Sequence, residues 1–132
     1  MGIIQIREIG FHQDDRGWCI RPISDDEIKK GIISDIHMVS MKPGAIRGNH
    51  YHVHKTENIL IIGSACRMLV VDNNTKEKEE KIIENSDKML FVIPPDVTHA
   101  IENIGNEVSY LFCFSYVKDS LKGRDVINNK II

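Results

Sequence analysis

A series of short apolar runs, each closed by turn-forming residues, most constrains what this 132-residue chain can fold into. The runs cover residues 34–41, 58–63, 65–72, 88–93, 98–103 and 107–116, and the turns between them include Pro43-Gly44, Asn73-Asn74, Pro94-Pro95 and Gly105-Asn106. Such runs are typical of β-strands, because glycine, proline and asparagine favour turns. We expect about eight to ten strands, which predicts an all-β sandwich or small barrel, with a jelly roll among the main choices. The run at 58–63 is continuously apolar, so we expect it to be buried on both faces.

One short helix is predicted near the N-terminus. Ser24 is followed three residues later by Glu27, which is the pattern of a capping box, and acidic residues fill the first turn. Gly31 is placed to end this helix in the left-handed conformation. Before the helix, residues 3–9 partly alternate and predict an opening strand, and a second strand is expected around residues 18–21.

One predicted strand carries an unusual density of histidines. His50, His52 and His54 are two residues apart, and side chains at i and i+2 of a strand share a face. Three imidazoles on one face are costly if they stay unpaired. The arrangement is favourable if they converge on a cation or share a proton-transfer task. One strand cannot complete such a site, and Glu57 and His99 are the candidates to complete it.

The remaining histidines and Lys55 have simpler interpretations. His54 is interpreted as a residue of the rim or a support for its neighbours. Lys55 is either a catalytic cation or an exposed lysine. His12 and His37 have no partner in the sequence and are interpreted as structural.

Two segments resemble the motifs of the cupin superfamily. Residues 44–63, GAIRGNHYHVHKTENILIIG, resemble the first motif, and the matching residues are Gly44, His50, His52, Glu57 and Gly63. The segment at about 88–103 resembles the second motif, with Pro94, His99 and Asn103 in register and Asp96 where a glycine is usual. The resemblance implies one cupin domain over residues 1–132, a double-stranded β-helix or jelly-roll barrel.

The resemblance also implies a metal site. Its ligands are His50 and His52 from one strand, Glu57 from the next strand, and His99 from a strand laid across the barrel. Three imidazoles and a carboxylate suit a divalent metal, with Zn as the first choice and Fe, Mn or Ni as alternatives. A shell of four protein ligands or fewer leaves room for a further ligand on the metal.

A narrower resemblance involves KPGAIRGNHYH, KTE and IPPDVTHAIENIG. These stretches are similar to the C-terminal cupin domain of capsular polysaccharide-synthesising reductase/epimerase enzymes, where the domain is a zinc-dependent C3 epimerase of a UDP-4-keto sugar. DDRGWC and RGNHYH are more distantly similar to dTDP-4-dehydrorhamnose 3,5-epimerases and dTDP-4-keto-6-deoxyglucose ketoisomerases. The rhamnose-pathway epimerases are metal-free and usually carry glutamine where this chain has His52. The resemblance therefore implies a metal-dependent epimerase or isomerase of a nucleotide-activated 4-keto sugar in surface polysaccharide biosynthesis.

The implied reaction removes a proton from the carbon next to a ketone and returns one to the opposite face. The enolate needs stabilisation by a metal or a cation, and a base must remove the proton. The candidate acid/base and charge-stabilising residues are His50, Tyr51, His54, Lys55, Tyr110 and Tyr116, among which the sequence does not choose. Arg47 and Asn49 are the candidate substrate-binding residues. Arg47 suits a pyrophosphate, although it could equally be a structural arginine that ties the turn.

The composition and charge of the chain argue against some classes of binding partner. The net charge is −2, with acidic and basic residues interleaved, so neither a nucleic-acid surface nor a polybasic membrane patch is expected. No apolar run is long enough for a signal peptide or a membrane span, which favours the cytoplasm. Cys19, Cys66 and Cys113 are interpreted as reduced, mostly buried thiols. A homodimer is expected from the resemblance, and the tail at 118–132 is predicted to be a short helix or a swapped arm.

Other functions remain compatible with the same residues. A different small metal cupin, such as a sugar-phosphate isomerase or a dioxygenase, would use the same ligands. A non-enzymatic module that binds sugar or metal is the third interpretation. An epimerase exchanges a carbon-bound hydrogen of its substrate, a dioxygenase consumes oxygen, and a binding module does neither.

Overall fold

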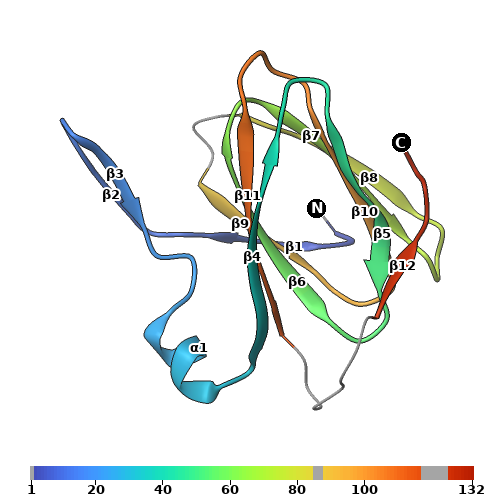
Figure 1. The fold of residues 1–132 in the computed structure, drawn as a ribbon. Coiled ribbons are helices and arrows are strands. Elements are labelled where there is room, and N and C mark those ends of the chain that lie inside the picture. Colours follow the sequence, from blue (N-terminus) through green and yellow to red (C-terminus); the bar gives the residue numbers. More distant parts are fainter. Residues whose placement is uncertain (1, 85–87, 117–124) are drawn as a thin grey trace.

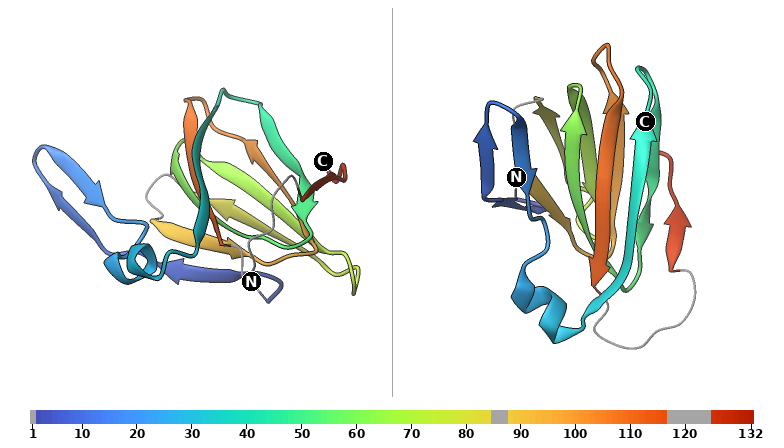
Figure 2. Two further views of the ribbon diagram at one scale, coloured as in Figure 1. Left: turned by 60° about the horizontal axis from the view of Figure 1, so that its bottom comes forward. Right: turned by 60° about the vertical axis from the view of Figure 1, so that its left-hand side comes forward.

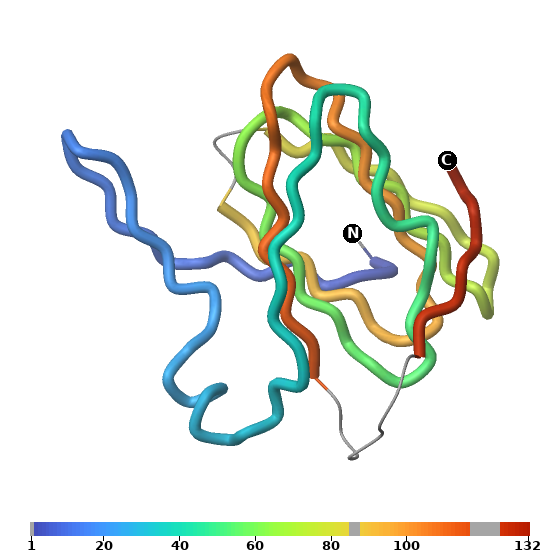
Figure 3. Tube along the Cα trace, in the orientation of Figure 1, coloured from blue at the N-terminus to red at the C-terminus, as the bar shows by residue number. Residues whose placement is uncertain are grey.

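Two five-stranded antiparallel sheets lie face to face in the computed structural model, which describes residues 2–84, 88–116 and 125–132 (Figure 1). In spatial order, the first sheet contains β1 (Gln5–Glu8), β9 (Met89–Ile93), β6 (Thr56–Gly63), β11 (Ser109–Tyr116) and β4 (Ile33–Met41). The second sheet contains β12 (Val126–Asn128), β5 (Ile46–His52), β10 (Val97–Asn103), β7 (Cys66–Asp72) and β8 (Lys78–Ile83). The chain curves around a shared interior (Figure 3). The arrangement confirms the predicted all-β jelly roll.

Apolar side chains from both sheets fill this interior. Ile59 and Ile61 of β6 pack in one cluster with Met68 and Val70 of β7, which lies in the opposite sheet. Each pair is two residues apart, so both members share the inward face of their strand. The partly alternating runs of the sequence therefore fold with their apolar face inward.

β6 is also buried on its outer face, as its continuously apolar sequence predicts. Leu60 lies in a second cluster with Leu90 and Phe114. Partly buried residues that pack against this cluster include Ile9, Ile20 and Ile23. They come from the N-terminal segment, which therefore covers part of the outer face of the first sheet.

A separate hairpin projects from the two sheets (Figures 1 and 2). It consists of β2 (Phe11–Asp14) and β3 (Gly17–Ile20), which pair antiparallel. Every residue of β2 is exposed. The sequence predicted β3 but not β2, because the polar run before the turn has none of the apolar alternation that indicates a strand.

The predicted helix is present as α1 (Asp25–Lys30). The Glu27 N–H donates to Ser24 Oγ at 3.1 Å, and the Ser24 N–H donates to a Glu27 carboxylate oxygen at 3.2 Å. Gly31 ends the helix at φ 65°. The capping box and the left-handed glycine are thus confirmed.

The C-terminal residues differ from their prediction. Residues 118–124 of the predicted tail lie outside the described residues. Beyond them, β12 pairs antiparallel with β5, so that Ile127 lies opposite Tyr51. The prediction of a short helix is therefore wrong for this part of the tail. A strand of three residues is too short to show a recognisable apolar pattern in the sequence.

Two further expectations concern the thiols and the membrane. Cys66 and Cys113 are buried, as predicted, whereas Cys19 is exposed on β3. Within the described ranges, no helix combines the length and the apolar character that crossing a membrane requires.

Candidate functional site

β5 and β10 are neighbours in the second sheet, and their pairing sets His50 opposite His99. The expectation that His99 comes from a strand across the barrel is therefore wrong. The residue that lies across is Glu57, because β6 belongs to the first sheet. Sequence spacing could not reveal this, since the order of strands in a sheet depends on long-range pairing.

A kink in β5 aims its histidines at β10. Gly48 has φ 94° and Asn49 has φ 55°, and the β5–β10 register shifts between His99 and Ala100. A Cβ atom on Gly48 would lie 2.6 Å from the His99 carbonyl oxygen. Only glycine fits such an approach at this positive φ, so the glycine before the histidine pair has a local physical cause.

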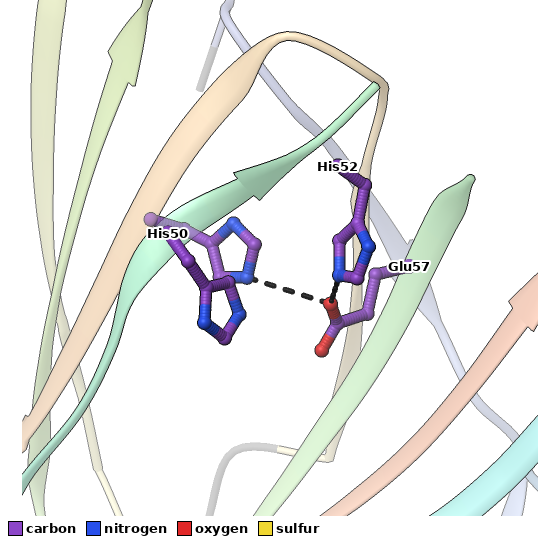
Figure 4. A group of neighbouring side chains, drawn as sticks. His50, His52 and Glu57 are labelled. Atoms are coloured by element: carbon purple, nitrogen blue, oxygen red, sulfur yellow. Dashed lines mark hydrogen bonds and ion pairs between the residues drawn. The ribbon is translucent and has the colours of Figure 1, made fainter. Parts of the chain in front are cut away.

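His50, His52, Glu57 and His99 each offer one potential ligand atom, and these four atoms lie within 4.8 Å of one another. We call these four residues the histidine cluster. His52 Nε2 lies 2.6 Å from Glu57 Oε2 (Figure 4). His99 Nε2 lies 3.5 Å from the same oxygen. Glu57 and His99 are buried, and His52 is largely so. The structure therefore brings together the four residues predicted as metal ligands.

His54 does not share this face. β5 ends at His52, and His54 lies exposed in the following turn. The two-residue alternation that predicted three histidines on one face stops with the strand. The expectation for His54 as a third inward imidazole is therefore wrong.

Asp125, just before β12, holds the outer side of His52. Its Oδ1 lies 2.9 Å from His52 Nδ1, and its Oδ2 accepts the backbone N–H groups of His54 and Lys55, both at 2.9 Å. His52 thus stands between two carboxylates, so both ring nitrogens are donors. Burial lowers the pKa of His52, but the hydrogen bonds and charges of Glu57 and Asp125 outweigh it, so the pKa is raised. The ring is held as an imidazolium when no metal is bound.

Glu57 is the charge that organises the cluster. Burial raises its pKa, but the contacts with His52 and His99 outweigh burial and hold the pKa far below its usual range. The carboxylate is therefore ionised near neutral pH. A buried anion of this kind requires a cation beside it.

His50 has an unshared electron pair near Glu57, and so does His99 in its neutral form. Burial, followed by the charge of His99, lowers the pKa of His50 to about 4, so its ring is neutral at pH 7. The His99 Nδ1 lies 3.2 Å from the Val97 carbonyl, which can only accept, so in the neutral ring the lone pair is on Nε2. That nitrogen is buried and has no hydrogen-bond partner among the described residues. The lone pair of His99 Nε2 and the Glu57 carboxylate are therefore placed to bind a cation between them.

The cluster opens into a cavity of about 400 Å³ between the two sheets. Its lining combines His50, Glu57 and His99 with His37 and Arg47 and with apolar residues such as Ile59 and Leu111. Arg47 is exposed on β5, and its guanidinium donates to the Ser40 carbonyl at 3.3 Å. The site thus has a buried polar floor and a cationic group near solvent.

Most of the other predicted acid/base residues lie elsewhere. Tyr51 alternates with His50 and His52, so it faces the other side of β5. Lys55 contributes a backbone N–H to Asp125 and does not line the cavity. Tyr110 is 47% exposed, and Tyr116 packs against the outer cluster of the first sheet. The structure does not bring Tyr51, His54, Lys55, Tyr110 or Tyr116 to the cavity lining.

Asn49, predicted to bind substrate, is engaged by the chain itself. Its Oδ1 accepts the N–H groups of Ile131 and Ile132 at 2.8 and 3.0 Å, and its Nδ2 donates to the Ile132 carbonyl at 3.4 Å. These bonds fasten the C-terminal residues along β5. The side chain has little capacity left for a ligand.

Two motif residues have structural roles. Asp96, where cupins usually have glycine, adopts φ 62°, and its N–H donates to the His52 carbonyl at 2.8 Å. Aspartate tolerates this conformation better than most residues, so the glycine-type turn is kept. Asn103 Nδ2 donates to the carbonyls of Met41 and Glu107 at 2.9 and 2.7 Å, tying together two turns at one end of the sheets.

Sequence reasoning missed Asp125 and the pair Asp35–His37. Asp125 lies in the tail, where nothing marks it as a partner of His52. A signal for the pair did exist, because Asp35 and His37 are two residues apart on a predicted strand and must share a face. His37 Nδ1 lies 2.6 Å from Asp35 Oδ2, so His37 has a partner after all.

Comparison with known proteins places these features in context. A family model described as polysaccharide biosynthesis C-terminal domain matches residues 12–122. The chain is 25% identical over 125 residues to the spore coat polysaccharide biosynthesis protein SpsL of Bacillus subtilis (strain 168). That alignment covers 88% of this chain and 82% of SpsL.

Solved structures show the same fold at low identity. The capsular polysaccharide assembling protein CapF of Staphylococcus aureus matches with a TM-score of 0.66 at 21% identity, over 93% of this chain and 33% of CapF. The chain therefore spans about a third of the length of CapF. The dTDP-6-deoxy-D-glucose-3,5-epimerase RmlC of Legionella pneumophila, in complex with dTDP-4-keto-L-rhamnose, matches with a TM-score of 0.75 at 15% identity, over 97% of this chain and 73% of RmlC. These likenesses confirm the cupin jelly roll.

Proposed function

The chain belongs to the polysaccharide biosynthesis C-terminal domain family, and on that premise we propose that it epimerises or isomerises a nucleotide-activated 4-keto sugar. The observation that carries the proposal is the histidine cluster at the floor of an open cavity between the sheets. SpsL, a relative by sequence, is named for polysaccharide biosynthesis, and RmlC, a relative by fold, is an epimerase with a keto-sugar nucleotide bound. SpsL supports a role in making a surface polysaccharide, and RmlC supports epimerase chemistry on a nucleotide-linked keto sugar.

The chemistry requires a base beside a ketone. A C–H bond next to a carbonyl loses its proton only when the enolate is stabilised, so an anion must be met by positive charge. In the metal-free protein, His52 supplies a fixed imidazolium, and His50 offers a neutral ring that faces the cavity. His50 also has no hydrogen bond to another described side chain that would block proton transfer, which supports its predicted role as a base in the metal-free protein. A metal held by the same lone pair would leave that role to another group.

We propose further that the cluster holds a divalent metal, with zinc as the first choice. Three imidazole nitrogens and a carboxylate oxygen are donors that suit zinc, and the unpartnered His99 Nε2 is the atom that a cation would satisfy. A bound cation would stabilise the negative charge that develops on the ketone oxygen. Asp125 supports His52 as a ligand, because a carboxylate on Nδ1 fixes the ring and directs Nε2 inward.

Arg47 is the proposed contact for the nucleotide. It lines the cavity and is exposed, so its guanidinium can turn to a pyrophosphate while apolar residues of the cavity surround the sugar. Asn49 is not included, because the C-terminal residues occupy its amide group.

The test is hydrogen exchange into the sugar. The purified protein is incubated in deuterium oxide with UDP- and dTDP-linked 4-keto-6-deoxyhexoses, and proton NMR follows the positions beside the ketone. Deuterium should enter one of these positions and an isomer should form. Binding of these nucleotides without exchange would contradict the proposal and favour a binding module.

Metal content is measured separately, by elemental analysis of protein purified without an affinity tag that binds metal. About one ion per chain that is lost in H52N supports the ligand set. An active enzyme without metal would refute the metal and leave His50 as the base.

A second copy of the chain is the proposed partner. β4 is an edge strand of the first sheet, and its outward residues Ile36 and Met38 are 56% and 64% exposed. The projecting hairpin adds the exposed Phe11 and Trp18. Apolar edges of this kind are usually covered, which supports a homodimer through β4 and the hairpin. Light scattering should give twice the chain mass for the wild type and the chain mass for M38E, and a monomeric wild type would refute the dimer.

A further inference from the structure

His37 lies in the sheet that faces His50 and His99. It is on β4, opposite Cys113 of β11 in the strand register, and both residues line the cavity. Its Nδ1 lies 2.6 Å from Asp35 Oδ2. Because a carboxylate only accepts, Nδ1 carries the hydrogen, and the neutral ring has its lone pair on Nε2. This is the arrangement in which a carboxylate orients a histidine for proton transfer.

Inversion at a carbon needs a proton carrier on each face of the sugar. The predicted tyrosines do not line the cavity, as described above. Outside the histidine cluster, the described lining residues with an ionisable hydrogen are His37, Arg47 and Cys113. A guanidinium does not give up its proton in proteins. Burial raises the pKa of the Cys113 thiol, which makes it a poor proton carrier near neutral pH. His37 is left.

We propose that His37 is the acid/base residue on the β4 side of the substrate and that Asp35 is its positioning residue. This inference rests on the proposed epimerase function. In one direction, His37 Nε2 accepts the proton from the carbon beside the ketone, and the C–H electron pair moves into the enolate. A group on the side of the histidine cluster then delivers a proton to the opposite face. In the reverse direction, protonated His37 donates to the enolate carbon, so the step needs no other reactant.

The structure also offers a competing role for His37. Potential ligand atoms of His37, Glu57 and Cys113 lie within 4.8 Å of one another, so His37 could instead help to hold a cation. The two roles differ in one measurable respect. Loss of a metal ligand lowers the metal content of the protein, whereas loss of a proton carrier leaves it unchanged.

The experiment compares wild type with H37N, D35N and H12N. His12 is a matched control, because it is an exposed histidine on β2 that does not line this cavity. Each epimer of a UDP- or dTDP-linked 4-keto-6-deoxyhexose is presented separately in deuterium oxide. Inversion and deuterium uptake are followed by NMR, with metal content and thermal melting measured for every variant. His37 and Asp35 are both 45% exposed, so the folded state should persist in the variants.

H37N should slow inversion about 100-fold or more, the usual contribution of a positioned acid or base. It should slow deuterium uptake from one epimer only, because His37 serves one face. D35N should lower kcat for inversion with little change in KM, and H12N should match wild type.

Three results would overturn the assignment. H37N could invert at the wild-type rate, or it could slow exchange from both epimers alike, as a structural defect would. Loss of bound metal in H37N would make His37 a ligand instead. A wild type that exchanges no hydrogen with either epimer refutes the proposed function itself, and the role of His37 falls with it.

Discussion

Replacing Asp125 with asparagine isolates the charge that holds the outer side of His52. The side chain keeps its size and can still accept hydrogen bonds, but its negative charge is gone. Asparagine has one oxygen where aspartate has two. If that oxygen keeps the N–H groups of His54 and Lys55, it is a neutral acceptor, and His52 Nδ1 faces an NH2 group in place of a charged oxygen. A hydrogen bond to a charged group contributes about 1.5–3 kcal/mol and a neutral one about 0.5–1.5, so each exchange costs about 1 kcal/mol.

The contribution of each hydrogen bond to the free energy of unfolding depends on how far its donor is buried. His54 is exposed, so water replaces part of its bond, whereas His52 and Lys55 are partly buried. Counting the latter two gives a loss of about 2 kcal/mol in the free energy of unfolding of the metal-free protein. For a chain of this length, that loss lowers Tm by roughly 6–10 °C. Metal affinity should fall about 10- to 100-fold, the usual effect of removing a carboxylate behind a histidine ligand.

The loss of stability is measured by thermal melting with a chelator present. The loss of zinc affinity is measured by competition with a calibrated zinc indicator. E102Q is the control, because Glu102 also loses one negative charge in the second sheet, where its carboxylate pairs with Arg67 at 3.1 Å. This ion pair is partly exposed, so E102Q should cost about 1 kcal/mol or less and leave zinc affinity unchanged. If D125N behaves like E102Q in both assays, Asp125 does not support the site.

Two further predictions concern the strand that carries the histidines. G48A places a Cβ atom 2.6 Å from the His99 carbonyl oxygen at φ 94°. It should therefore lower the free energy of unfolding by roughly 2–3 kcal/mol, as measured by urea titration. An unchanged midpoint would refute the close approach. The pKa of His50 is lowered to about 4, whereas an unfolded histidine titrates near about 6.5. The unfolded chain therefore binds this proton first, and the metal-free protein should lose stability as the pH falls from about 6.5 to 4. H50N should flatten that slope, and an identical slope in both proteins would contradict the assignment.

Local chemistry explains what the sequence predicted correctly. The capping box of Ser24 and Glu27 and the glycine end of α1 depend on a few neighbouring residues, so they could be predicted without tertiary information. The continuously apolar β6 likewise shows its burial directly, because the pattern depends on the strand itself. The inward pair His50 and His52 follows from the period of two along β5.

The errors have long-range causes. His99 was expected across the barrel, whereas β10 lies beside β5, and only strand pairing decides between these arrangements. Asp125 reaches His52 from 73 positions away in the chain, so no spacing rule connects them. The expectation that His54 shares a face with His50 and His52 failed because β5 ends two residues earlier than the alternation implied. Asp35 and His37 differ from these cases, since their two-residue spacing was visible and only its meaning was missed.

The charges around His52 determine how the site should respond to a metal. Without metal, Glu57 and Asp125 carry two negative charges and the His52 imidazolium carries one positive charge. A divalent ion that binds His52 Nε2 must displace the hydrogen from that nitrogen, after which the ion balances both carboxylates. Zinc binding near pH 7 should therefore release about one proton per ion. Calorimetry in buffers of different ionisation enthalpy measures this number, and D125N should release less because its His52 has a lower pKa. Binding that releases no proton would mean that His52 is not a ligand, or that its two carboxylates do not hold it charged.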